Sequence, residues 1–308
     1  MTQLDPQLQT VIGDLAADLP EWHTMSVERA RELEAELFTP EDPPPVEDVR
    51  EFAVDGPRDP LRLRTYRHRI DPPAPVCLFF HGGGWVMGTL DSADDLARAI
   101  ARRANCLVVS VDYRLAPEHP FPAAVEDART ALDWLESNGP TIDADTNRLA
   151  VAGSSAGGAL AAALGRWSRR PHTPAIAHQL LLYPILDPDA ETTVPDAPLL
   201  SRADVEWFWD TYLRSPVDRE HPYAAPAAAE DLSGLPPTTI LTAGLDPLGE
   251  EGQAFAQRLD GAGVPVENLH YPQLSHGSLS LAEEVDAADA AMEQVTARLR
   301  TALESPNA

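Results

Sequence analysis

The segment VAGSSAGGAL, residues 151 to 160, places small residues between an expected strand and an expected helix. Its centre, Gly153, Ser154, Ser155, Ala156 and Gly157, satisfies the pattern G-x-S-x-G. In this context the pattern is typical of a sharp, strained turn that projects a serine hydroxyl at the N-terminus of the helix. We therefore interpret Ser155 as a candidate nucleophile. A glycine-rich turn without chemistry is the alternative that the pentapeptide alone leaves open.

Strand-like and helix-like segments alternate on both sides of this turn. The expected strands are 61–68, 75–80, 106–111, 148–153, 178–184, 238–244 and 264–271. The expected helices are near 91–104, near 122–137, from about 155, near 249–262 and from about 280. Apolar strands separated by helices indicate an α/β fold with a central, mostly parallel sheet covered by helices on both faces.

Two segments do not follow this alternation. Residues 1–40 have a helical pattern, including the amphipathic stretch VERARELEAELF, and the prolines of EDPPPVED end it. Residues 187–225 contain PDAPLLS and WFWDTYL and interrupt the rhythm of the sheet. We expect residues 1–45 to form an N-terminal helical cap segment and linker, and 46–308 to form the main domain, with 187–225 contributing to the cap.

A serine hydroxyl attacks poorly without a base, and the base needs a third group to orient it. In folds that carry the G-x-S-x-G motif, the three groups occur along the chain in the order Ser, acid, His. Asp246 follows the expected strand TTILTAG, and His276 lies in the loop after VPVENLHY. Both positions are just past the carboxyl ends of strands, where side chains can converge on Ser155. A helix-capping aspartate and a surface histidine are the alternatives, but the joint placement favours catalysis.

A second informative stretch, FFHGGGWVMG, residues 79 to 88, contains three consecutive glycines after an apolar strand. Acyl transfer to serine forms a tetrahedral oxyanion that needs hydrogen-bond donors placed in advance. Glycines at 82–84 let backbone N–H groups approach that charge, together with the N–H of Ala156. A phosphate-binding loop is the competing explanation, but the lysine and hydroxyl of a P-loop are missing from this stretch.

The charge balance excludes some classes of partner. The 308 residues include 49 Asp and Glu against 23 basic residues, all of them arginine, for a net charge of −26. Such a charge repels phosphate backbones and anionic membrane surfaces, so we expect neither nucleic acid nor stable membrane association. A solvated acidic surface from a biased proteome and adaptation to a salty cytoplasm both remain open as its origin.

The segment MTQLDPQLQT lacks the features of a signal peptide, and no apolar window approaches the length of a membrane span. Cys77 and Cys106 both lie in apolar runs, which suits two buried thiols in a reducing compartment. We therefore expect a soluble, cytoplasmic protein.

Five motifs occur in an order that resembles a known family. They are HGGGW (81–85), DYRLAPEHPFPAAVEDA (112–128), GSSAGG (153–158), DLSGLPPTTILTAGLDPL (231–248) and SHG (275–277). From about residue 60 onward the chain resembles bacterial-type members of the hormone-sensitive lipase family of α/β-hydrolase esterases. The resemblance implies a helical cap over an acyl pocket, a triad of Ser155, Asp246 and His276, and oxyanion donors at Gly83, Gly84 and Ala156.

This resemblance implies a serine carboxylesterase that acts on small-molecule esters with short to medium acyl chains and uses no metal and no cofactor. A non-catalytic small-ligand-binding module on the same fold, like the plant gibberellin receptors, is the alternative. Such a receptor can discard its histidine, whereas this chain keeps Ser155, Asp246 and His276. The enzyme is therefore favoured, and a homodimer is left open.

The chain also departs from the family pattern. Ser154 stands where the family usually has aspartate, Ser278 where phenylalanine is usual, and Gly249 where arginine is common. We interpret the charged residues of the DYRLAPE motif, Asp112, Arg114 and Glu118, as a structural network of paired charges. The aromatic residues of the insertion, Trp207, Phe208, Trp209 and Tyr212, either line an acyl pocket or dock the cap on the core.

Overall fold

An eight-stranded sheet forms the centre of the computed structural model, which describes residues 3–16 and 21–304. The strands are β1 (Asp48–Val54), β2 (Leu61–Arg67), β3 (Ala74–Phe80), β4 (Leu107–Val111), β5 (Ala144–Ser154), β6 (His178–Leu182), β9 (Thr238–Leu245) and β10 (Val266–Ser275). Their order is β1-β2-β4-β3-β5-β6-β9-β10. The pairs β1–β2 and β2–β4 are antiparallel and all others are parallel, so the predicted mostly parallel sheet is confirmed.

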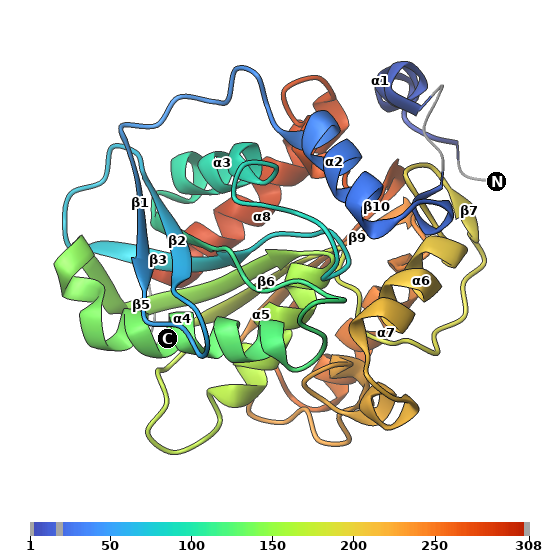
Figure 1. Ribbon diagram of the computed structural model, residues 1–308. Helices are drawn as coiled ribbons and strands as arrows, with labels where there is room; N and C mark the ends of the chain where they lie inside the picture. The colour runs from blue at the N-terminus through green and yellow to red at the C-terminus, as the bar shows by residue number, and fades with distance from the viewer. Residues whose placement is uncertain (1–2, 17–20, 305–308) are drawn as a thin grey trace.

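Helices cover both faces of this sheet (Figure 1). They are α3 (Asp94–Ala104), α4 (Ala123–Asn138), α5 (Ala156–Trp167), α7 (Gly249–Gly261) and α8 (Asp286–Glu304). Leu132 of α4, Leu160 of α5 and Leu259 of α7 belong to one buried cluster. Ile100 of α3 and Val295 of α8 belong to a second cluster on the other face. A strand buried between two helical layers has apolar residues along its whole length. Strand β3, in which every residue is buried, is an example.

The two segments outside the alternation form smaller elements. The first contains α1 (Pro6–Ala16), the 3-10 helix η1 (Trp22–Thr24) and α2 (Val27–Phe38). The second contains the short strands β7 (Asp196–Ala197) and β8 (Leu200–Ser201), then α6 (Arg202–Tyr212) and η3 (Pro216–Glu220). Each of α2 and α6 starts at a serine, Ser26 or Ser201, whose hydroxyl accepts a hydrogen bond from a backbone N–H of the first turn.

These two segments contact each other, although they are far apart in the sequence. The indole of Trp22 donates to the carbonyl of Leu199 at 3.0 Å, and the backbone N–H of His23 donates to Asp204 Oδ1 at 2.9 Å. Residues 1–2 and 17–20 of the expected cap segment lie outside the described residues. Both segments therefore sit in one layer next to the carboxyl ends of the strands, where they line a cavity described below.

The structure differs from the sequence-based expectation at several element boundaries. The edge strand β1 was not expected, because its side chains are mostly exposed and only Val54 is buried. The last helix begins at Asp286 rather than near 280, because a 3-10 turn, η5 (Ser278–Leu281), follows Gly277, whose φ is +74°. Two further 3-10 turns, η2 (Gly139–Ile142) and η4 (Pro226–Ala228), join neighbouring elements.

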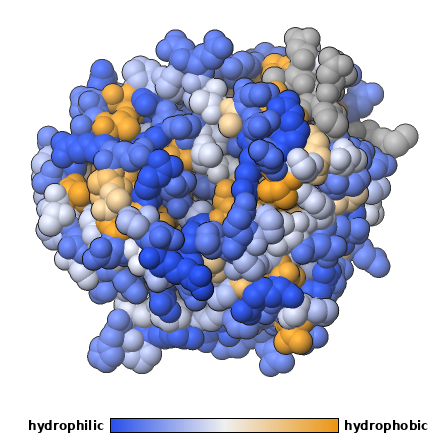
Figure 2. Space-filling model, viewed as in Figure 1, coloured by the Kyte–Doolittle hydropathy of each residue, from blue (hydrophilic) through white to orange (hydrophobic). Residues whose placement is uncertain are grey.

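The surface is hydrophilic over most of the face shown in Figure 2, and its apolar residues lie in small separate patches. Val49 and Val217 are the exposed large hydrophobic residues in the described part of the chain. Within residues 3–16 and 21–304, no helix has both the length and the apolar character that crossing a bilayer requires. Cys77 and Cys106 are free and fully buried, which confirms the expected buried thiols.

Candidate active site

Ser155 occupies a strained turn between β5 and α5. Its φ of 54° and ψ of −116° are uncommon for a residue with a side chain. A Cβ atom at Gly153 would lie 2.1 Å from the carbonyl oxygen of Gly157, and one at Gly157 would lie 2.0 Å from that of Phe80. Because neither position has room for a side chain, the turn requires glycine at both ends of the G-x-S-x-G pattern.

The three residues expected to form a triad lie within hydrogen-bond distance of one another. His276 Nε2 is 3.0 Å from Ser155 Oγ, and His276 Nδ1 is 2.9 Å from Asp246 Oδ2. The other oxygen of Asp246 accepts the backbone N–H of Leu248 at 2.9 Å, which fixes the carboxylate. With a proton on Nδ1 held by Asp246, Nε2 of the imidazole can accept the proton of Ser155.

The topology of the sheet explains why these residues meet. Ser155 follows β5, Asp246 follows β9 and His276 follows β10, and these strands are parallel. The carboxyl ends of parallel strands lie at one edge of a sheet, so residues distant in the sequence converge there. The sequence-based placement of all three residues at strand ends therefore corresponds to one site.

The glycines after β3 form the neighbouring wall of this site. Gly83 and Gly84 have φ values of +99° and +60°. The Gly83 carbonyl accepts the N–H groups of Val86 and Met87 at 3.0 and 2.8 Å, which closes the turn. In the described part of the chain, the N–H groups of Gly83, Gly84 and Ala156 donate to no backbone carbonyl. Three unused donors therefore lie close in sequence or space to Ser155, as an oxyanion hole requires.

The side chains of His81 and Tyr113 contact the backbone of this glycine loop. The sequence analysis did not identify either residue as part of the site. Their rings stack with centroids 4.2 Å apart. The Tyr113 hydroxyl donates to the His81 carbonyl at 2.9 Å, and His81 Nδ1 lies 2.8 Å from the Gly82 carbonyl. Burial lowers the pKa of His81, so its ring is neutral near pH 7. The neutral ring packs on Tyr113 and donates a hydrogen bond from Nδ1 to the Gly82 carbonyl.

The charged residues of the DYRLAPE motif form paired contacts, as expected, and their partners lie on neighbouring elements outside the motif. Asp112 pairs with Arg62 of β2 at 2.8 Å, and Arg114 pairs with Asp127 of α4 at 2.8 Å. Glu118 instead forms a two-oxygen contact with Arg31 of α2, at 2.8 and 2.7 Å. None of the three motif residues lines the cavity around Ser155. Each one ties the loop to a different neighbouring element.

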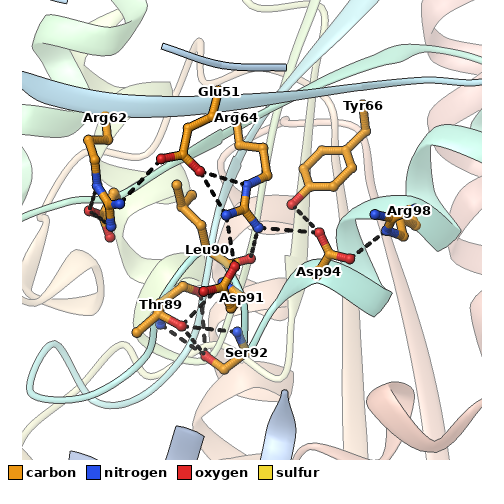
Figure 3. Close-up of polar contacts among 11 residues, drawn as sticks. Glu51, Arg62, Arg64, Tyr66, Thr89, Leu90, Asp91, Ser92, Asp94 and Arg98 are labelled. Atoms are coloured by element: carbon orange, nitrogen blue, oxygen red, sulfur yellow. Dashed lines mark hydrogen bonds and ion pairs between the residues drawn. The ribbon is translucent and has the colours of Figure 1, made fainter. Parts of the chain in front are cut away.

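Arg64 ties the loop that follows the glycines to the antiparallel edge of the sheet. Figure 3 shows its guanidinium between Glu51 of β1, Asp91 of the loop and Asp94, the first residue of α3, at 2.8, 2.7 and 3.4 Å. Asp94 also accepts the Tyr66 hydroxyl at 2.8 Å. Because Arg64 is largely buried, these contacts are screened less than surface pairs, and they hold the segment between the glycine loop and α3.

Two acidic residues at the start of α7 hold the beginning of the insertion. Glu251 is buried and accepts the N–H of Leu186 at 2.6 Å, while Glu250 accepts both the N–H and the hydroxyl of Thr193 at 2.8 and 2.9 Å. Burial raises the pKa of Glu251 well above its usual value. Gly249, which precedes them, has no room for a side chain, because its Cβ would lie 2.4 Å from the Ala243 carbonyl.

A cavity of about 130 Å³ adjoins Ser155 and His276. The two segments outside the strand–helix alternation contribute Trp22, Glu34, Phe38, Leu199, Leu200, Val205 and Phe208 to its wall. The main domain contributes the three glycines 82–84, Met87, Ser92, Ala93, Leu96, Ser154, Tyr183, Ile185, Leu248, Gly277 and Ser280. The volume is close to that of an apolar cavity that holds benzene, about 150 Å³. The site therefore has room for a small, mostly apolar group beside the serine.

The aromatic residues of the insertion divide between the two roles considered for them. Phe208 lines the cavity. Trp209 and Tyr212 instead pack on Trp85, with ring centroids 4.7 and 4.1 Å away, and so dock α6 on the main domain. Trp207 is half-buried and packs against Phe208. Helix α6 thus contributes one residue to the cavity wall and two residues that hold the helix on the main domain.

The fold and this geometry define a class of protein. Residues 77–280 match the family described as the alpha/beta hydrolase fold, and the chain belongs to this family.

Several relatives are similar over most of their length. The chain is 43% identical over 264 residues to the esterase LipI of Mycobacterium tuberculosis, which covers 83% of this chain and 82% of LipI. It is 38% identical over 314 residues to the carboxylesterase NlhH of the same species, which covers 97% of each chain. The solved structure of a hyperthermophilic esterase from Pyrobaculum calidifontis is similar with a TM-score of 0.90 at 35% identity, covering 97% of this chain and 98% of that one.

Proposed function

We propose that this protein is a serine carboxylesterase that hydrolyses short- to medium-chain carboxylic esters through an acyl-enzyme intermediate. The observation that carries the proposal is the continuous hydrogen-bonded series from Ser155 through His276 to Asp246. Relatives that are named esterase and carboxylesterase support the same reaction. A ligand-binding module without catalysis is disfavoured, because it would have no use for an oriented base.

In the proposed mechanism, Ser155 Oγ attacks the ester carbonyl carbon while His276 Nε2 takes the hydroxyl proton. Asp246 stabilises the imidazolium that forms. The N–H groups of Gly83, Gly84 and Ala156 donate to the oxyanion. His276 then gives its proton to the departing alcohol, which leaves an ester between Ser155 and the acyl group. Water, activated by the same imidazole, attacks this ester and releases the acid and free Ser155.

We propose that residues 1–45 and 187–225 act together as a cap over the site. Support comes from their shared contribution to the cavity wall and from the hydrogen bonds of Trp22 and His23 to the second segment. The cavity beside Ser155 is about the size of one that holds benzene, which favours short acyl chains over long ones. The substrate is a small-molecule ester. The two free thiols support a reducing, cytoplasmic location, and a homodimer stays a prediction.

The test is hydrolysis of p-nitrophenyl butyrate by Ser155→Ala, His276→Ala and the double variant. Each single variant should lose about 10³-fold or more in kcat, and the double variant should lose little more, because the residues act as a unit. Ser168→Ala, at the other end of α5, is the matched control and should keep full activity. Folding is checked by circular dichroism. Normal activity in a folded Ser155→Ala protein would end the proposal.

The same assay, run as a series from acetate to palmitate esters, tests the proposed chain length. The cavity predicts the highest kcat/KM at short to medium chains and a steep fall beyond the length that fills it. A maximum at palmitate would contradict the cap as the boundary of the acyl site, and would leave the serine mechanism unaffected.

A further inference from the structure

Glu34 is a buried acidic residue in the wall of the cavity. It lies on α2, where Ala30 and Glu34 are the buried positions, and its exposed fraction is 8%. Val27, Ala30 and Glu34 share one face of the helix, because residues spaced by three or four positions are neighbours. That face is directed at the main domain, and Glu34 is the member of it that lines the cavity.

No basic group neutralises this carboxyl in the described part of the chain. The hydroxyl of Ser92 and the N–H of Gly88 approach it, and burial raises its pKa despite both. Arg31 lies one turn away but is engaged elsewhere: its guanidinium contacts Glu118 and donates to the carbonyls of Val86 and Ala116. The Glu34 oxygen Oε2 is fully buried and has no hydrogen-bond partner among the described residues.

A buried carboxyl group with an unsatisfied oxygen is destabilising, because that oxygen has lost its hydrogen bonds to water and gained none in the protein. The Ser92 hydroxyl and the Gly88 N–H do not satisfy the whole carboxyl group, because Oε2 still has no hydrogen-bond partner among the described residues. A bound substrate can supply the missing hydrogen-bond donor. The unpaired oxygen then destabilises only the free protein, and the new hydrogen bond favours binding. Sites of this kind discriminate strongly, because an analogue that lacks the donor leaves the buried group unpaired.

We infer that Glu34 is a specificity-determining residue that accepts a hydrogen bond from a hydroxyl group of the ester substrate. The inference rests on the proposed esterase function and specifies its substrate class as hydroxy esters. A hydroxyl fits better than an ammonium group, because one acceptor satisfies it, whereas an ammonium carries three donors. Among the described residues that line the cavity, Glu34 is the one carboxylate, so an ammonium group would find no second anionic partner there.

The experiment compares hydroxy esters with apolar analogues of the same shape, by pH-stat. On the acyl side the pair is ethyl 3-hydroxybutyrate and ethyl 3-methylbutyrate. On the alcohol side it is 2-hydroxyethyl butyrate and propyl butyrate. We expect the wild-type protein to prefer the hydroxyl member of at least one pair by about tenfold or more in kcat/KM. Equal rates within both pairs would overturn the inference.

Three variants separate specificity from structure. Glu34→Met keeps the length of the side chain and should abolish the preference while propyl butyrate is still hydrolysed. Glu34→Gln keeps an acceptor oxygen and should retain part of the preference. Glu36→Gln, an exposed position on the same helix, should leave the ratio unchanged.

A purely structural role for Glu34 would lower the rates of both members of a pair together and leave their ratio as in the wild type. That result, or a stronger preference for 2-aminoethyl butyrate than for 2-hydroxyethyl butyrate, would overturn the assignment. A wild-type protein that hydrolyses none of these esters would instead contradict the proposed function, so the two failures are distinguishable.

Discussion

Gly84 occupies a position at which both the backbone and the surroundings exclude a side chain. Its φ is +60°, and a Cβ atom there would lie 2.1 Å from Cδ1 of Phe208. The aromatic ring of α6 therefore packs directly on the loop that carries the proposed oxyanion donors. A side chain at this position would have to displace either the ring or the loop.

We expect Gly84→Ala to lower kcat for p-nitrophenyl butyrate by about 10²–10³-fold, the usual loss when one oxyanion donor is removed. The added methyl group displaces the N–H of residue 84 from its place, while the triad stays intact. Gly13→Ala is the control, because a Cβ at Gly13 in α1 meets nothing within 4 Å. Steady-state kinetics on the folded variant check the result. A kcat near that of the wild type would show that this N–H takes no part.

At the level of single residues, the sequence predicts what lies in contiguous motifs and misses what only tertiary packing creates. The placement of Ser155, Asp246 and His276 at one edge of the sheet was predictable, because each follows a strand that the sequence pattern indicates. Glu34 was missed because VERARELEAELF contains four glutamates, and only its position on the same helix face as Ala30 distinguishes it. The stacking of His81 on Tyr113 joins two motifs 32 residues apart, so no local pattern could reveal it.

Helix α3 begins with two aspartates that differ in their surroundings. Asp94 contacts Arg64, Arg98 and the hydroxyl of Tyr66. Asp95 accepts the backbone N–H of Leu96, but its other neighbouring charges are acidic. Burial, with the repulsion of these charges, raises the pKa of Asp95 to about 7. The helix N-terminus favours the ionised form but does not offset burial.

This pKa predicts how Asp95→Asn changes stability with pH. In the unfolded chain the carboxyl ionises near pH 4, and in the folded protein only near pH 7. The folded state binds more protons in this interval, so the wild-type protein loses stability as the pH rises through it. We expect Asp95→Asn to raise Tm at about pH 8 by a few degrees, corresponding to about 1–2 kcal/mol for a half-buried group, and to have little effect near pH 4.

Thermal unfolding of both proteins between these pH values tests the prediction. Glu283→Gln, an exposed acid between η5 and α8, is the control and should change Tm little at any pH. An Asp95→Asn effect of equal size across the range would mean that ionisation of Asp95 does not determine it.

At the level of elements, the type of most strands and helices was predictable, but their neighbours were not. The central strands have long apolar runs, whereas β1 is exposed along most of its length and gives no such signal. The place of β4 between β2 and β3 depends on crossover connections, which the hydrophobic pattern of the chain does not encode. The pairing of η1 with the insertion depends on Trp22 and Leu199, which are 177 positions apart.

At the level of the whole molecule, the net charge of −26 predicts a response to salt. Repulsion among surface acids destabilises the compact state, and the Debye length falls from about 10 Å at 0.1 M to about 3 Å at 1 M salt. We expect Tm to rise with KCl, and ester hydrolysis to persist at molar KCl because the short contacts of the triad are screened less. The competing account, a compositional bias without salt adaptation, predicts full stability in dilute buffer. A Tm that is flat or falls with KCl would support that account.

Because Cys77 and Cys106 are fully buried, the reactivity of their thiols reports how often the protein unfolds. Cys77 is in β3 and Cys106 immediately precedes the adjacent strand β4, and burial raises the pKa of both thiols, that of Cys106 to about 12. A thiol needs both access and ionisation to react with a disulfide reagent. Labelling therefore proceeds only through molecules in which the middle of the sheet has separated, and its rate under native conditions measures how often that occurs. The natural chain thus carries two chemical probes of global unfolding, without any introduced label.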